Sequence, residues 1–250
     1  MDKEFQNQIL EIIEDAGEAL LDFFDQPIQI QKKDDGSPVT EADLASNQIL
    51  CMNLSQLYDI PIISEENSKE SNLAAAEEKE YWMIDPLDGT KAFLKKNKEF
   101  AICLALIKNG RPKYGFIHVP FEKKTYFNLS ENNAYVKNSN GEIKEIYTRK
   151  SNKLEVLTSK RIFKQDEFSG FVKEEDIARI SIISSAIKFT EIAEGHAQIC
   201  PYFVDTMQWD TAAGDAIVHA SGGSVLDLEG NLLKYGNINK FINPYFMVKA

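Results

Sequence analysis

The segment Trp82-Met83-Ile84-Asp85-Pro86-Leu87-Asp88-Gly89-Thr90 joins an apolar run to an acidic turn and to the start of a helix. The apolar run predicts a buried strand that delivers Asp85 to the end of a sheet. Pro86 has no N–H for a strand ladder and Asp88-Gly89 is a turn dipeptide, so we expect the strand to end here. Residues 90–96 have helix-forming composition. Two carboxylates, a main-chain carbonyl and several free N–H groups are therefore predicted in one small volume.

Two kinds of ligand suit this arrangement. Carboxylate and carbonyl oxygens suit a hard cation such as Mg²⁺, and the free N–H groups at a helix N-terminus suit a phosphate. The alternative is that Asp88-Gly89 is only a turn that caps a helix, which is the commoner use of such dipeptides. That alternative leaves Asp85 at the strand end unexplained.

Length and charge limit the kinds of partner. The 250 residues are enough for one large domain or two small domains that share an interface. With 28 basic and 39 acidic residues the net charge is −11, which argues against nucleic acid or an anionic membrane as a partner. If the substrate is an anion, cations must first neutralise the carboxylates that meet it.

The sequence also favours a cytoplasmic location. It opens on an amphipathic segment, not on a secretory signal, and no apolar run approaches membrane-spanning length. Peripheral association with the inner membrane stays open, as does the choice between a monomer and a homodimer.

The three cysteines are far apart and lie among apolar residues, as expected for reduced thiols in the core. No zinc-ligand spacing relates the cysteines to the histidines, which are Cys51, Cys103, Cys200, His118, His196 and His219.

The first half of the chain combines helices with short strands. Apolar residues recur at helical spacing over residues 5–24, and Thr40 with Asp43 predicts a capped helix that continues towards Tyr58. Asp43 could merely be the capping acid of this helix. We expect a short strand, a turn-rich loop, an apolar strand ending on Ser64-Glu65-Glu66, and a polar loop with a helical turn at residues 28–33, 34–38, 60–63 and 67–80.

Successive strands follow, at residues 100–108, 113–119, 124–129, 134–137 and 142–147. Asn109-Gly110 and Asn140-Gly141 connect such strands and are strong hairpin signals. We therefore predict an antiparallel sheet with helices packed on it. The composition turns polar around residues 148–153, where we place the boundary between an α+β half, residues 1–150, and a smaller half, residues 151–250.

The smaller half alternates strands with helices, which is typical of a mostly parallel α/β sheet. Strands are expected at residues 154–159, 178–183 and 197–200, helices at 188–195 and 211–220, and further short strands within 224–248. Asp210 precedes a helix and could be only its N-cap. Gly222-Gly223 could be only the turn that ends that helix.

Taken together, these blocks resemble a known group of phosphatases. Glu65-Glu66 after a strand, the Asp-Pro-Leu-Asp-Gly-Thr block of residues 85–90, and Trp209-Asp210 followed after eleven residues by Gly222-Gly223 carry the resemblance. The group is the Mg²⁺-dependent, lithium-sensitive superfamily of inositol monophosphatases, fructose 1,6-bisphosphatases and 3′(2′),5′-bisphosphate nucleotidases. The resemblance runs from about Asp34 to the C-terminus.

Within this superfamily the chain looks most like the CysQ-type 3′(2′),5′-bisphosphate nucleotidases. The blocks that carry this closer resemblance are residues 88–100, 184–189, 193–195 and 242–244. The chain departs from the pattern at Ala92, where these enzymes usually have Glu, and at Asp215, which replaces a neutral residue or His. Both departures bear on substrate preference.

The resemblance implies a layered αβαβα sandwich with the site between the two halves. Two or three Mg²⁺ ions would be held at the positions that match the family's ligands, which are Glu65, Asp85, the Leu87 carbonyl, Asp88 and Asp210. Thr90 with Glu65 would orient and deprotonate the attacking water, and Asp43 would lie beside the metals. The implied substrate-binding positions are Gly89 and Thr90, through their N–H groups, together with Ser184, Ser185, Lys188 and Asp210.

The implied activity is hydrolysis of the 3′-phosphate of adenosine 3′,5′-bisphosphate, a small nucleotide, to give AMP. Lys188 is our candidate for the pocket that holds the rest of the molecule; alternatively it is a solvated surface lysine. Action on inositol phosphates or another sugar phosphate is the main alternative. A haloacid-dehalogenase-type phosphatase would need an Asp where Pro86 stands, and a cation-binding protein without catalysis would have a broken ligand set, whereas this set is intact.

Overall fold

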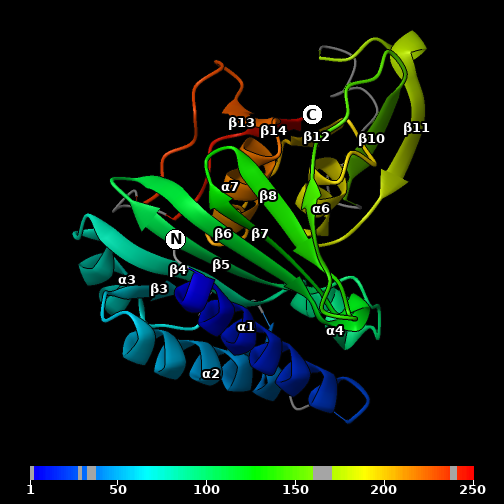
Figure 1. Ribbon diagram of the computed structural model, residues 1–250. Coiled ribbons are helices and arrows are strands. Elements are labelled where there is room, and N and C mark those ends of the chain that lie inside the picture. The colour runs from blue at the N-terminus through cyan, green and yellow to red at the C-terminus, as the bar shows by residue number, and fades with distance from the viewer. Residues whose placement is uncertain (1–2, 28–29, 33–37, 160–170, 237–240) are drawn as a thin grey trace.

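The computed structural model describes residues 3–27, 30–32, 38–159, 171–236 and 241–250. In this part of the chain, helices and sheets form successive layers (Figure 1). The long helices α1 (Lys3–Phe24) and α2 (Glu41–Leu57) lie side by side on one face of a large sheet. The helices α6 (Ile187–Ala193) and α7 (Ala212–Ala220) lie between the opposite face and a second sheet. The predicted layered α/β architecture is confirmed.

The large sheet has seven strands, and the predicted hairpin strands form most of it. The first two strands are parallel and every later pair is antiparallel. In spatial order the strands are β3 (Ile62–Ser64), β4 (Glu80–Asp88), β5 (Ala101–Lys108), β6 (Arg111–Val119), β7 (Lys124–Ser130), β8 (Asn133–Lys137) and β9 (Ile143–Ile146).

Alternate side chains of β4 pack in two different apolar cores, because successive strand residues point to opposite faces of a sheet. Trp82 and Ile84 belong to the apolar cluster that includes α1 and α2. Tyr81 and Met83 belong to the cluster that includes α6 and α7. The continuous apolar run in the sequence therefore reflects a strand that is covered on both faces.

The prediction that this strand ends at Pro86 is wrong, because β4 continues to Asp88. Asp85 pairs with Cys103 of β5, whereas Asp88, three residues later, pairs with Ala101, two residues away on the partner strand. This shift in register is a bulge, and a bulge leaves residues such as Pro86 outside the regular ladder.

The second sheet has five strands in the order β11-β10-β12-β14-β13. β11 and β12 run parallel to β10, while β14 is antiparallel to both of its neighbours. The strands are β10 (Leu154–Thr158), β11 (Ile177–Ile182), β12 (Ile199–Tyr202), β13 (Ser224–Asp227) and β14 (Phe246–Lys249). The predicted parallel arrangement therefore holds for the first three strands only.

Several short elements complete the described chain. They are the paired strands β1 (Ile30–Lys32) and β2 (Pro38–Thr40), the helices α3 (Lys69–Ala76) and α4 (Thr90–Leu94), and the 3₁₀ turns Pro120–Glu122 and Glu174–Asp176. Most of the predicted loop at residues 34–38 lies outside the described residues, but Pro38 begins a strand. None of the described helices combines the length and apolar composition that crossing a bilayer demands.

A close backbone contact joins the two halves of the chain. A Cβ atom at Gly115 of β6 would lie 2.3 Å from the carbonyl oxygen of Ala213 in α7. Only glycine permits this approach, so α7 rests directly on the large sheet. The main apolar cluster accordingly contains side chains from both sides of residue 150. The division into residues 1–150 and 151–250 stays a prediction.

Candidate active site

Three carboxylates from distant parts of the sequence meet at one edge of the large sheet. Glu65 directly follows β3, Asp85 lies in β4, and Asp210 lies two residues before α7. Because β3 and β4 are parallel, their carboxyl ends lie at the same edge. One oxygen from each of these three side chains lies within 4.8 Å of the others.

Asp210 is held in this group by the chain that precedes α7. Its Oδ2 accepts a hydrogen bond of 3.1 Å from the Met207 N–H. The N-cap of α7 is Thr211, so the alternative that Asp210 only caps a helix does not hold. The carboxylate of Asp210 is therefore available to the cleft.

Burial raises the pKa of three aspartates at this site, and repulsion between neighbouring carboxylates adds to the rise. The pKa of Asp85 is well above its ordinary range because the carboxyl is buried and lies near Glu65, Asp88 and Asp210. Burial and the same kind of repulsion raise the pKa of Asp210. Burial raises the pKa of Asp88 to about 6, although Lys188 and the Ala186 N–H counteract it. Such a cluster favours the binding of cations, which would remove the repulsion.

Asp88 connects the acidic cluster to the second half of the chain. Its Oδ2 accepts a hydrogen bond from the N–H of Ala186, which is the N-cap of α6. The neighbouring Ser185 has a left-handed backbone, with φ of 59°. The bulge in β4 and the turn before α6 thus meet at one carboxylate.

Thr90 and Asp43 form a polar pair next to the acids. Thr90 Oγ1 is 3.2 Å from Asp43 Oδ1 and 3.2 Å from the Leu87 carbonyl oxygen. The second oxygen of Asp43 accepts the Thr40 N–H at 2.8 Å and completes a capping box. Asp43 therefore caps α2 and also contacts Thr90. Its place beside bound metals stays a prediction.

A cleft of about 980 Å³ opens over these groups. Most of the predicted site residues line it, namely Glu65, Asp85, Leu87, Asp88, Gly89, Thr90, Ser184, Ser185 and Asp210. Asp43 and Lys188 do not line it. Gly89 has φ of 100°, which favours glycine, and it forms the N-cap of α4.

Other lining residues were missed by the sequence interpretation. Lys91 and Lys95, at either end of α4, bring positive charge to the cleft. Trp209 and Phe241 form an apolar wall, with ring centres 5.6 Å apart. Trp209 could have been found by its position beside Asp210, whereas nothing local in the sequence places Phe241 near the acids.

A family model described as the inositol monophosphatase family matches residues 1–246. The chain belongs to this family. The 3′(2′),5′-bisphosphate nucleotidase CysQ of Salmonella typhimurium is 37% identical over 244 residues, which cover 96% of this chain and 98% of that relative. The CysQ nucleotidase of Escherichia coli K12 is 35% identical, with coverage of 97% and 98%.

Solved structures of the inositol monophosphatase family share the fold. CysQ from Bacteroides thetaiotaomicron has a TM-score of 0.82 and 27% identity, and the match covers 98% of this chain and 97% of that one. An inositol monophosphatase/NADP phosphatase complexed with Mg²⁺ and phosphate has a TM-score of 0.80 at 17% identity, with coverage of 99% and 90%. Metal dependence is a property of the family, and the acidic cluster described above is a suitable site for it.

Lys188 is buried beneath the turn that precedes α6. It is only 4% exposed, so the alternative of a solvated surface lysine does not hold. Its Nζ donates to the carbonyl oxygens of Ile183, at 3.3 Å, and Ser185, at 2.6 Å. The ammonium group thus lies behind the cleft wall, under the turn that carries Ser184 and Ser185.

The two departures from the CysQ-type pattern have different surroundings. Ala92 lines the cleft, so its small side chain bears directly on the space for substrate. Asp215 is buried away from the cleft lining, where it pairs with Arg111 at 3.0 Å and accepts the Tyr235 hydroxyl at 3.0 Å. Asp215 therefore bears on packing between the halves and not on direct contact with substrate.

Proposed function

We propose that this family member is a Mg²⁺-dependent 3′(2′),5′-bisphosphate nucleotidase that hydrolyses the 3′-phosphate of adenosine 3′,5′-bisphosphate to AMP and phosphate. The observation that carries the proposal is the likeness to CysQ nucleotidases over nearly the whole chain, with 37% identity to the Salmonella enzyme. The acidic cleft supports it. We further propose that the protein acts in the cytoplasm as a monomer or homodimer.

Two or three Mg²⁺ ions would be held by Glu65, Asp85, the Leu87 carbonyl, Asp88 and Asp210. An all-oxygen donor set suits this hard cation. The raised pKa of Asp85 means that its charged form is costly in this cluster unless a cation is bound. When bound, Mg²⁺ supplies charge neutralisation for the phosphate and lowers the pKa of a water molecule.

The chain's own residues would position the reacting groups. The Thr90 hydroxyl, placed between Asp43 and the Leu87 carbonyl, would orient the attacking water, and Glu65 would accept its proton. The N–H groups of Gly89 and Thr90 would bind the phosphate oxygens. Hydrolysis then proceeds by in-line displacement without a covalent enzyme intermediate.

Substrate choice would depend on groups that hold the rest of the molecule. A nucleotide bisphosphate offers a flat base and a second phosphate. The Trp209–Phe241 wall suits the base, and Lys91 and Lys95 carry suitable charge for a phosphate. Ser184, Ser185 and Asp210, which line the cleft, remain our proposed substrate-binding residues. Lys188 would act through its charge from behind the Ser184-Ser185 turn.

The test compares kcat/KM for adenosine 3′,5′-bisphosphate, inositol 1-phosphate and fructose 1,6-bisphosphate, with Mg²⁺ and with excess EDTA. We expect the nucleotide to be preferred, EDTA to abolish turnover, and Li⁺ and Ca²⁺ to inhibit. Equal or better use of a sugar phosphate would refute the nucleotidase proposal and favour an inositol monophosphatase or related activity. Full turnover in EDTA would refute the metal assignment.

A further inference from the structure

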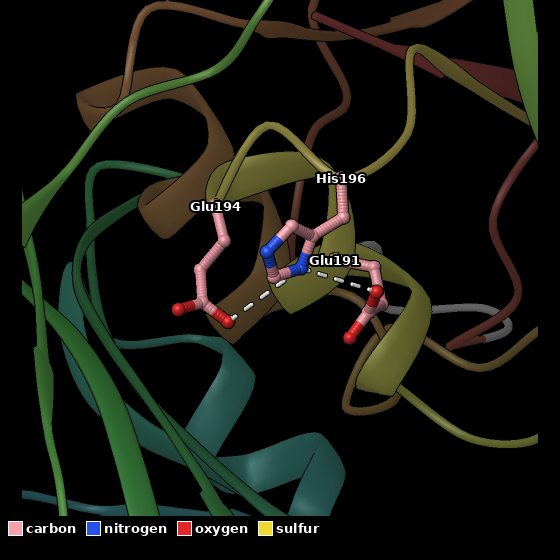
Figure 2. A group of neighbouring side chains, drawn as sticks. All are labelled: Glu191, Glu194 and His196. Atoms are coloured by element: carbon pink, nitrogen blue, oxygen red, sulfur yellow. Dashed lines mark ion pairs between the residues drawn. The ribbon is translucent and has the colours of Figure 1, made fainter.

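We infer a second divalent-cation site at the C-terminal end of α6, formed by Glu191, Glu194 and His196 (Figure 2). None of these residues lines the cleft described above. Figure 2 shows the imidazole lying between the two carboxylates. His196 Nδ1 is 3.3 Å from Glu191 Oε2 and 4.0 Å from Glu194 Oε2. One donor atom from each residue lies within 4.8 Å of the other two.

The backbone at the end of α6 brings these side chains together. The His196 N–H donates to the Glu191 carbonyl oxygen at 2.9 Å, and the Gly195 N–H donates to the Ile192 carbonyl oxygen at 3.0 Å. With Gly195 at φ of 78°, this pair of bonds is a Schellman motif, which folds the chain back over the last helical turn. The position of His196 relative to Glu191 is therefore set by the helix end itself.

The charges around the cluster favour a cation. Glu122 lies close enough for its charge to act on Glu191. The ammonium group of Lys124 is paired with Glu122 at 3.0 Å. Three carboxylates thus share one ammonium group and one imidazole, and the C-terminal end of a helix adds partial negative charge.

The donor set indicates a zinc-like metal and not Mg²⁺, because Mg²⁺ prefers oxygen donors alone. A tetrahedral Zn²⁺ with bonds of about 2.0–2.2 Å places its donors about 3.3–3.6 Å apart. The separations of 3.3 and 4.0 Å are close to this range. The Tyr126 hydroxyl donates to Glu194 Oε2 at 2.7 Å and would orient this carboxylate.

The sequence interpretation missed this site because it considered only cysteine and histidine spacing. Two of the three donors are glutamates, which are common on exposed helices. The three donor side chains come together only because the helix end turns His196 back over Glu191.

The test is calorimetric titration of the full chain with Zn²⁺, in saturating Mg²⁺ so that the carboxylates of the cleft are occupied. We expect His196→Ala and Glu191→Gln to weaken one binding event by about tenfold or more. His219→Ala is the matched control, because His219 is also an exposed histidine at a helix end. Unchanged affinity and stoichiometry in His196→Ala would overturn the inference.

A second measurement follows the imidazole directly. In protein with ¹⁵N-labelled histidine, the ring nitrogen signal of His196 should shift when Zn²⁺ is added. A Zn²⁺ ion that enters only the cleft would leave this signal unchanged, and that result would also overturn the inference. Neither readout depends on which phosphate ester the protein hydrolyses.

Discussion

Asp85 supplies the most deeply buried of the cleft carboxylates, with 2% of the residue exposed. Replacing Asp85 by Asn preserves its size but removes a charge from the proposed metal site. We expect Asp85→Asn, and likewise Asp210→Asn, to lower kcat by about 10³-fold or more. Steady-state kinetics in saturating Mg²⁺ checks this, with circular dichroism to verify folding. A loss smaller than about tenfold would contradict the assigned role.

Thr90 tests the proposed positioning of water. Thr90→Ala removes the hydroxyl that lies 3.2 Å from Asp43 and should lower kcat by about 10²-fold. Thr90→Ser is the matched control, because it keeps the hydroxyl, and should retain most of the activity. Equal losses in the two variants would show that the methyl group matters and the hydroxyl does not.

The acidic cluster should also make Mg²⁺ binding visible in thermal stability. The pKa of Asp88 rises from an ordinary 3.8 to about 6 in the folded protein. Its contribution to stability is therefore fully present below pH 3.8 and is lost as the pH rises through about 6. Bound Mg²⁺ would offset this loss. We expect the Mg²⁺-induced rise in Tm, relative to EDTA, to be larger at about pH 7.5 than at about pH 5. Equal rises would contradict this.

At the scale of helices and strands, the structure of a single element was predicted well from its own sequence pattern. The apolar spacing of residues 5–24 predicts α1, and Thr40 with Asp43 predicts the capped start of α2. Contacts between elements were harder to predict from the sequence. The bulge around Pro86 depends on how β5 pairs with β4, and no local pattern encodes that register.

Lys188 shows the same limit at the entrance to α6. The sequence offers a pocket lysine or a solvated one, whereas the side chain is buried and bonded to two carbonyl groups of its own turn. That outcome depends on the tertiary packing that closes over the turn.

Lys188→Ala should raise KM for adenosine 3′,5′-bisphosphate by about ten- to hundredfold and barely affect p-nitrophenyl phosphate. The reason is the loss of a positive charge behind the Ser184-Ser185 turn, which would attract the second phosphate of the nucleotide, a group that the small ester lacks. Steady-state kinetics with both substrates checks this. An equal loss with both would mean that Lys188 only supports the Ser184-Ser185 turn and the charge of Asp88.

At the scale of the whole molecule, the site depends on contact between residues far apart in the sequence. Glu65, Asp85 and Asp210 lie on three separate elements, and composition or periodicity alone could not bring them together. The resemblance to the family predicted that these three acids share one site. It could not supply the Arg111–Asp215 pair, because Asp215 is a departure from the family pattern.

Asp215→Asn tests whether this pair stabilises the contact between halves. It leaves Arg111 without its charged partner, and we expect the free energy of unfolding to fall by about 2–3 kcal/mol, less than for a fully buried pair because Arg111 is partly exposed. Urea unfolding measures the change. KM should not change in this variant, since Asp215 does not line the cleft. A large change in KM with unaltered stability would contradict the proposed role.

The contact between Gly115 and Ala213 has a consequence for natural variation. Any side chain at position 115 would push α7 away from the large sheet, and Asp210, two residues before that helix, would move with it. A Gly115→Ala allele changes one methyl group at a position that does not line the cleft, and a comparison of residue chemistry would score it as harmless. We expect such an allele to behave as a loss-of-function allele in a population.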